Sequence, residues 1–462
     1  MTERLITGSI RISNYDYPYS YQRETEEITV YIGSKAEVIP ENTDIIIGQK
    51  FGMLTGGKTL YKLSVPLSND CTIFENGKSI YASMGNQTRT IEYFIEDYQE
   101  NSYYTEMRLR FPELDYFIPS FEIANVHDDK IVVSRAPKTL CSFDFVYHGT
   151  EVTIIFYAKM NCHLNFKAAV ETISEVVLKF PATNDLDFLC GLYDTARCFF
   201  SFLCNRQNIG LRNAVLVGKY PTKKMDNNKI VDVDKYTSQK VCFSQKYLEP
   251  EEDKKQVAKA PNIRLLLEKI PELFRMFSEK TADSIATVNR NSVHHSIKYR
   301  NLIDLEQSLH IAATFEYYVR TLLPEMSSES TISFIRDLST LLDEYIKGSS
   351  GKKKQKAEKY KKSLSPQIPL EEKVKKVYNG YSEWKPLKPL LTEWFGDDIS
   401  ALANAANSWR NELAHEKREY QPTVDVINAV RLIEHINYCI VFRHAGYSDE
   451  KIKSIIAEIL VR

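Results

Sequence analysis

The chain has 462 residues, of which 43% are hydrophobic and 26% are charged, and its formal net charge is −1. These values exclude a disordered or collagen-like chain, and the length is enough for about two or three domains with proper cores. Because the net charge is close to zero, no overall field draws the protein to nucleic acid, and any such attraction must come from a local basic patch.

The eight cysteines are spread along the chain and do not form the dense framework of a small secreted protein. The N-terminal sequence enters an alternating strand pattern without the apolar core of a signal peptide, and no apolar run is long enough to span a bilayer. We therefore expect a cytoplasmic protein with reduced thiols and no membrane partner. One histidine and three cysteines could be considered as ligands of a zinc ion, but their spacing does not match that of a closed zinc knuckle. We therefore expect buried core cysteines and no metal. The residues considered are His163, Cys190, Cys198 and Cys204.

The first 180 residues are predicted to be mainly β-structure. Several segments alternate apolar and polar side chains over the length of a strand, and Gly56-Gly57 is typical of a hairpin turn. The spacing between these segments predicts an antiparallel sheet or sandwich. Gly56-Gly57-Lys58 lacks the spacing of a phosphate-binding loop. The predicted strands are 5–12, 27–32, 43–48, 104–110, 130–133 and 151–157.

Residues 184–204 have the length and apolar content of a helix, and a few short strands are expected between residues 210 and 260. Pro250 and Pro261 bracket a charged stretch, which predicts a domain boundary. We expect a β-rich regulatory domain at 1–260, a connecting helix at 261–285 that Pro271 kinks or splits, and a helical bundle at 286–462. Within the bundle, the apolar pattern predicts a helix at 424–444 that forms bundle core or a dimer seam. The fold class is then α+β multidomain, with a β-rich N-terminal domain and an all-α C-terminal domain.

A lysine-rich insert at residues 347–362 is predicted to be mobile and solvated. One interpretation is a solubilising loop between bundle helices. The other is a surface that captures an RNA backbone, to which Tyr360 adds base stacking. The candidate RNA-binding residues are Lys352, Lys353, Lys354 and Lys356, and Lys373, Lys375 and Lys376 extend the positive stretch.

The sequence Arg410-Asn411-Glu412-Leu413-Ala414-His415 lies in a pattern of apolar residues that predicts a helix. An arginine is always cationic and a histidine titrates near neutrality, so together they can stabilise a phosphate and move protons during phosphodiester cleavage without a metal. On an ideal helix Asn411 and His415 share a face, whereas Arg410 and His415 are about 140° apart. An arginine and a histidine at this spacing also occur by chance on solvated surfaces.

This string resembles the motif of the HEPN family, helical bundles whose nuclease members carry an arginine and a histidine separated by four to six residues, often written RN…AH. Here Arg410-Asn411 and Ala414-His415 carry the resemblance. It implies a metal-independent endoribonuclease, in which the 2′-OH attacks the adjacent phosphate and leaves a 2′,3′-cyclic phosphate and a 5′-OH. His415 would be the general acid and base, Arg410 would stabilise the transition state, and Asn411 would orient the histidine or the phosphate.

The segment from Arg300 to Arg320 resembles the first HEPN helix, where an acidic residue often lies near the catalytic pair. Glu316 is the candidate, and it would position Arg410. The alternative is a surface ion pair between Glu316 and Arg320, four residues further along the same helix.

The layout of a β-rich half before a helical module resembles the ApeA-type antiphage proteins. That resemblance implies an abortive-infection toxin that needs no cofactor, acts as a homodimer with two motifs around one cleft, and is released from its N-terminal sensor by a phage-derived protein. Its substrate would be cellular RNA, with tRNA as a candidate. Two other interpretations stay open: a non-catalytic HEPN module that binds RNA or a protein partner, and a β-domain scaffold that the helical half only dimerises.

Overall fold

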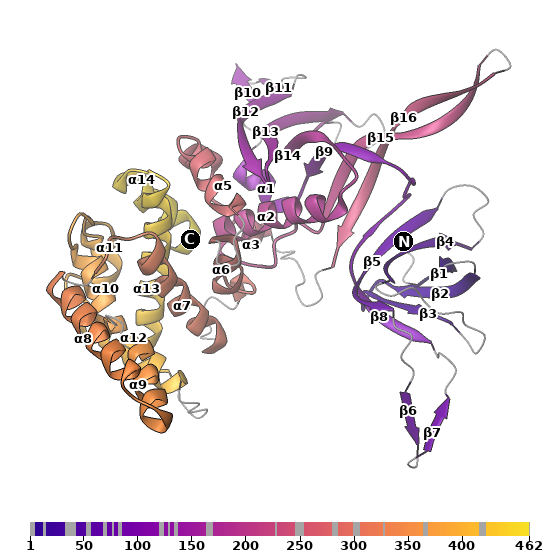
Figure 1. The fold of residues 1–462 in the computed structure, drawn as a ribbon. Coiled ribbons are helices and arrows are strands. Elements are labelled where there is room, and N and C mark those ends of the chain that lie inside the picture. The colour runs from indigo at the N-terminus through magenta and orange to yellow at the C-terminus, as the bar shows by residue number, and fades with distance from the viewer. Residues whose placement is uncertain are drawn as a thin grey trace. The chain divides into compact units, whose positions relative to one another are not determined.

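The computed structural model divides the chain into two compact units, residues 1–267 with 277–281, and residues 268–276 with 282–462 (Figure 1). The first unit is rich in strands and the second is helical, which confirms the predicted α+β multidomain class. The predicted boundaries at residues 260 and 285 stay a prediction. The structure describes residues 5–12, 15–32, 43–51, 57–67, 72–75, 78–81, 86–119, 124–127, 130–133, 137–162, 170–226, 229–244, 254–279, 285–298, 305–326, 329–363, 368–414 and 422–461.

Part of the first unit is a closed antiparallel barrel, in which the pairing of β5 with β8 completes a ring that runs β8-β3-β2-β1-β4-β5. The core of the barrel is filled by aliphatic and aromatic side chains. Among the aromatic ones, the ring centroids of Tyr21, Tyr61 and Phe94 are 5.3 to 6.1 Å apart. The strands are β1 (Leu5–Ile12), β2 (Tyr15–Gln22), β3 (Glu27–Val30), β4 (Thr43–Lys50), β5 (Lys58–Leu67) and β8 (Gln87–Ile95), and a small hairpin, β6 (Thr72–Glu75) with β7 (Lys78–Tyr81), lies between the last two in sequence.

The sheet continues beyond the barrel in the order β12-β13-β14-β9-β15-β16, again antiparallel. Helix α2 (Leu186–Cys204) packs against it through Phe200, whose ring is 6.4 Å from that of Phe156. The strands are β9 (Tyr103–Leu109), β12 (Lys138–Tyr147), β13 (Thr150–Cys162), β14 (Val170–Thr183), β15 (Asn213–Asp226) and β16 (Lys229–Phe243). The remaining elements of this part are β10 (Ala124–His127), β11 (Lys130–Val133), α1 (Pro112–Phe117), α3 (Lys254–Val257) and α4 (Ile263–Leu266).

One prediction for this unit and one for the segment that connects the two units need correction or completion. The short strands expected after residue 210 are two long ones. Strands β15 and β16 pair with each other along their whole length, while β9 pairs only with residues 214–219 of β15. The expected connecting helix is split into α4 and α5 (Ile270–Ser278), with Pro271 in the first turn of α5, where a missing N–H costs no helical hydrogen bond.

The second unit is a helical bundle around α13 (Val424–His444), whose predicted bounds are confirmed. Most of α13 is buried, and α7, α12 and α14 all pack against it. The other helices are α6 (Ile285–Ser292), α7 (Leu305–Thr321), α8 (Glu329–Lys347), α9 (Gly351–Ser363), α10 (Leu370–Asn379), α11 (Lys388–Phe395), α12 (Ser400–Ala414) and α14 (Asp449–Ile456), and a π-helical turn follows at Ala457–Val461.

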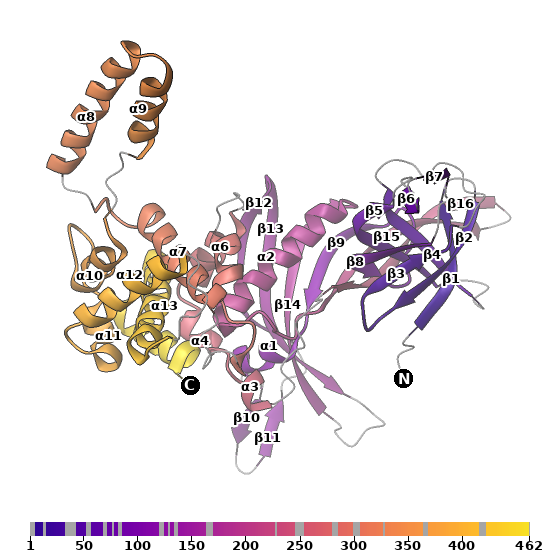
Figure 2. The same cartoon turned by 90° about the horizontal axis from the view of Figure 1, so that it is seen from below.

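The lysine-rich insert is a helix in the structure, not the loop that its composition predicted. Its residues from Gly351 onward form α9, which lies beside α8 in both views (Figures 1 and 2). Lysine is a good helix former, and α9 buries Ala357, so the run has both the propensity and a contact to hold it. Among the helices of the described residues, none is long and apolar enough to cross a membrane.

Candidate active site

Helix α12 carries the predicted motif and is fastened to the bundle by its small and apolar face. Ala403, Ala406 and Trp409 are buried, and α12 packs against α10 and α13. Near its start, the backbone N–H of Ser400 donates to Asp398 at 2.9 Å, and the hydrogen bonds from Ser400 lower the pKa of that carboxyl. Because Trp409 points into the core, the next residue on the helix, Arg410, is turned toward the surface of the bundle.

Arg410 meets a carboxylate from another helix. Its Nη2 donates to Oε2 of Glu316 on α7 at 3.1 Å, although the two residues are 94 positions apart. The Arg410 side chain stays 43% exposed, and among the residues that the structure describes Glu316 is the acceptor that its guanidinium contacts. The structure therefore brings together the predicted arginine and the predicted acidic residue.

The same carboxylate binds a second cation that sequence reasoning had placed only in a general positive stretch. Lys373 on α10 donates from Nζ to Oε1 of Glu316 at 3.1 Å. Two cations thus share one carboxylate, and the three side chains Glu316, Lys373 and Arg410 together carry a net positive charge. The alternative pairing within α7 is not the one the structure has, since the Arg320 guanidinium lies 6.0 Å from the ring centroid of Tyr317. Helix α10 also carries Lys375 and Lys376, so its sequence alone does not identify Lys373 as the lysine that contacts Glu316.

The other predicted site residues stand differently. Asn411 lies on α12 and is exposed. His415 follows the last residue of α12 in sequence and lies outside the described residues. The four candidate RNA-binding lysines, Lys352, Lys353, Lys354 and Lys356, are exposed on α9. The structure does not test the roles assigned to these residues.

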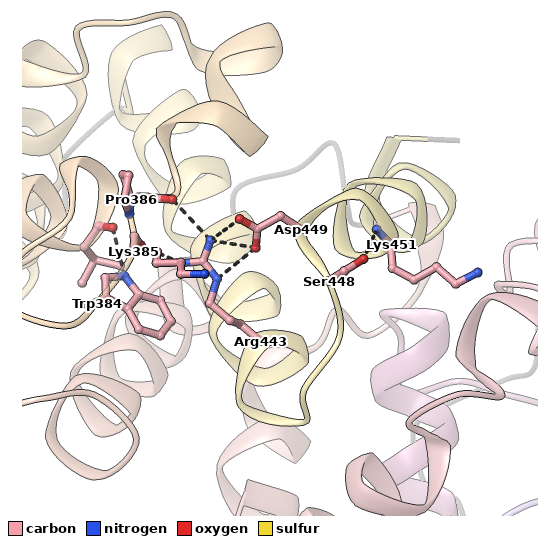
Figure 3. Close-up of polar contacts among 8 residues, drawn as sticks. Trp384, Lys385, Pro386, Arg443, Ser448, Asp449 and Lys451 are labelled. Carbon is pink, nitrogen blue, oxygen red and sulfur yellow. Dashed lines mark hydrogen bonds and ion pairs between the residues drawn. The ribbon is translucent and has the colours of Figure 1, made fainter.

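A second arginine of the bundle shows what a purely structural one looks like (Figure 3). Arg443, near the end of α13, donates to both oxygens of Asp449 at 2.9 Å and to the carbonyls of Lys385 and Pro386 at 2.6 and 3.3 Å. Its guanidinium also lies 4.8 Å from the ring centroid of Trp384. Only 13% of this side chain is exposed. Arg443 uses its donors to tie α13 to α14, whereas Arg410 keeps donors available.

A buried polar pair joins the bundle at another point that the sequence did not single out. His294 and Glu434 are both buried, and His294 Nε2 lies 2.9 Å from Glu434 Oε1. Three residues further along α13, Asn437 donates to the carbonyl of Ile311 on α7 at 3.1 Å. The Asn437 contact holds α7, the helix of Glu316, against α13, and the His294 pair holds the segment after α6 against the same helix.

No metal centre is found among the residues that the structure describes, since no three His, Cys, Asp or Glu side chains are grouped as a metal ion would require. Cys198 and Cys204 are buried in α2, as expected for core thiols, whereas Cys190 on the same helix is only partly buried. Burial raises the pKa of Cys204 to about 12. His163 of the discarded zinc hypothesis lies outside the described residues.

Comparisons with known proteins bear on the second unit. Residues 309–451 match the family model described as Apea-like HEPN, and this range includes Glu316, Lys373, Arg410 and His415. No curated protein and no solved structure matches the chain. The matched range runs from the first half of α7 into α14, and the elements that the structure describes within it are helices. Residues 309–451 of the second unit are therefore similar to the Apea-like HEPN domain.

Proposed function

We propose that this protein is a metal-independent endoribonuclease whose active site is built around Arg410 and His415. An HEPN domain points to a nuclease or RNA-related function. The observation that carries the proposal is the contact between Arg410 and Glu316, which holds an exposed guanidinium at a positively charged corner of the bundle. A guanidinium placed in this way can bind two phosphate oxygens in a single plane.

The proposed reaction is a transesterification. His415 takes the proton of the 2′-OH, the 2′-oxygen attacks the adjacent phosphorus, and the bond to the 5′-oxygen breaks as that oxygen receives a proton from the protonated histidine. The products are a 2′,3′-cyclic phosphate and a 5′-OH. Arg410 stabilises the charge that builds on the phosphate oxygens, and Asn411 orients the histidine or the phosphate.

Glu316 and Lys373 act on Arg410 in this proposal. The carboxylate restrains the guanidinium from one side and leaves its other donors for the phosphate. Lys373 shares that carboxylate, so it limits how strongly Glu316 attracts Arg410 and adds a positive charge beside the bound phosphate. The pair is partly exposed, so its own contribution to stability is small and its value lies in the placement of Arg410.

We further propose the biological setting that the Apea-like domain suggests. The enzyme acts as a homodimer in the cytoplasm during abortive infection, with two motifs around one scissile bond. The N-terminal β-rich unit acts as a sensor and a brake, because an unrestrained ribonuclease poisons its own cell. A phage-derived protein releases the brake, and the substrate is cellular RNA, with tRNA as the first candidate.

The test is RNA cleavage in EDTA by the full-length protein, in the presence of lysate from phage-infected cells as the source of a trigger. Wild type should yield discrete fragments that end in a cyclic phosphate, while Arg410→Ala and His415→Ala should each lose at least about a hundredfold in rate. Arg320→Ala and His310→Ala are the matched controls, since both replace the same residue types elsewhere on the domain, and they should cleave like wild type.

Two results would contradict the proposal. Cleavage that survives His415→Ala would remove the assigned acid and base. RNA that wild type binds in a salt-sensitive manner but never cuts, with or without infected lysate, would establish the non-catalytic RNA-binding module instead.

A further inference from the structure

The helical hairpin of α8 and α9 carries charge and apolar surface that the proposed active site does not use. Helix α9 contains seven lysines and one glutamate. The two helices run antiparallel side by side, Ala357 of α9 is buried, and Lys361 of α9 forms an ion pair with Asp343 of α8 (Figure 2). These contacts fix which sides of the two helices face the same way.

Helix α8 exposes a stripe of large apolar side chains. Phe334, Leu341 and Tyr345 are 65%, 61% and 51% exposed, and they are spaced at seven and four residues, which places them on one side of the helix. Scattered apolar residues are normal on a protein surface, but three large ones in line indicate a site where something binds.

The lysine helix contributes to that same side. Each residue advances by about 100° around a helix, so Asp343 lies about 200° from Leu341, on the opposite flank of α8. Around the axis of α9, Lys361 lies about 40° from Ala357 in one direction. Lys353, Lys356 and Tyr360 lie between about 40° and 100° from Ala357 in the other direction.

Because Lys361 meets Asp343 on one flank of the hairpin, the other three α9 residues share the flank of the apolar stripe. Tyr360 is 59% exposed there. We call this surface the hairpin face, defined by Phe334, Leu341, Tyr345, Lys353, Lys356 and Tyr360.

We propose that the hairpin face binds single-stranded RNA, with lysines on the phosphates and aromatic rings stacked on unpaired bases. The positive charge of α9 selects a polyanion over an ordinary protein partner. Three aromatic rings beside it favour a nucleic acid whose bases are free to stack, which a duplex does not offer. The proposal rests on the proposed function only in that the bound strand would be the enzyme's substrate.

The test measures binding of a fluorescein-labelled 2′-O-methyl oligouridylate, which cannot be cut through its blocked 2′-oxygen, to the full-length protein at several salt concentrations. Lys353→Gln/Lys356→Gln should weaken binding by about tenfold or more and lower the slope against log salt by about 1.4, at about 0.7 per phosphate contact. The matched control is Lys359→Gln/Lys362→Gln, which removes equal charge from the rest of α9 and should change affinity by less than about twofold. Equal losses in both double variants would mean that charge alone attracts the RNA, and the hairpin face would be wrong.

A separate set of variants tests whether aromatic stacking contributes to RNA binding. Tyr345→Ala should weaken binding by about tenfold, while Tyr345→Phe keeps the ring and should bind like wild type. Because the side chain is half exposed, thermal unfolding should not change. If Tyr345→Ala alters the molecular mass in light scattering and leaves RNA affinity intact, the stripe is covered by a second copy and the proposal fails. Binding of phosphatidylserine vesicles with the same variant pattern, and no RNA binding, would overturn it as well.

This experiment separates the two proposals. Arg320→Ala should bind the oligonucleotide like wild type, since Arg320 is not on the hairpin face. A protein that binds through the hairpin face but cuts nothing contradicts the proposed function alone. A protein that cuts RNA while all hairpin variants bind normally contradicts the present inference alone.

Discussion

Glu316 on α7 accepts a hydrogen bond from Arg410 on α12 at 3.1 Å, and its other carboxylate oxygen accepts one from Lys373 on α10 at the same distance. One side chain thus orders two cations from two other helices. If this arrangement serves catalysis, each of the three residues has a distinct and measurable effect.

Glu316→Gln should lower kcat for RNA cleavage by about ten- to a hundredfold while KM changes little, because the amide keeps the shape but no longer holds the guanidinium by charge. The free energy of unfolding should change by less than about 1 kcal/mol, since the pair is partly exposed. Glu306→Gln is the control, because Glu306 is an exposed glutamate near the start of the same helix. Unchanged kcat in Glu316→Gln would reduce the contact to a surface ion pair.

Lys373→Met should raise KM several-fold and affect kcat less than Arg410→Ala does, because the lysine adds charge beside the phosphate while the arginine contacts it. Lys375→Met is the matched control, since Lys375 lies on the same helix and pairs with Glu371. Steady-state kinetics on a short RNA substrate measure both constants. Equal effects of the two lysine variants would indicate that Lys373 acts only through general charge.

Arg443→Ala should destabilise the helical unit by about 3 kcal/mol, because it leaves Asp449 without its bidentate partner and two carbonyls without their donor. All three tryptophans of the chain, Trp384, Trp394 and Trp409, lie in this unit, so their fluorescence during urea unfolding reports on it selectively. Lys453→Ala removes an exposed pair with Glu393 and should cost less than about 1 kcal/mol. Similar midpoints for the two variants would contradict the structural role of Arg443.

Cys204 should make the first unit less stable at alkaline pH. Burial raises its pKa from 9.0 to about 12, so the folded state keeps a proton that the unfolded state releases above pH 9. The contribution of the protonated thiol to the free energy of unfolding is fully present below pH 9. It is lost as the pH rises toward 12, by about 1.4 kcal/mol per pH unit. The free energy of unfolding, measured with urea and circular dichroism at pH 9 and above, should therefore decline less steeply with pH for Cys204→Ala than for wild type. Parallel slopes would show that the thiol does not titrate on unfolding.

The sequence alone determined the features that depend on neighbouring residues. The apolar periodicity around Arg410 predicted α12, the pattern from Val424 to His444 predicted α13 with its bounds, and alternation predicted several barrel strands, because helix and strand periods are local properties. The resemblance of the Arg410–His415 string to the HEPN motif indicated the family that the comparison found. The same local reasoning failed for the lysine insert, where composition suggested a loop but burial of Ala357 against α8 supports a helix.

Only the tertiary structure decided which charges meet. Glu316 had an equally good partner in Arg320 by helical spacing, and nothing local distinguished Lys373 from the lysines around it. The packing of α7, α10 and α12 in one bundle selected Arg410 and Lys373, across separations of 94 and 57 residues. The choice is made by the apolar faces that bring the helices together, and the ion pairs form between whichever charges those faces leave side by side.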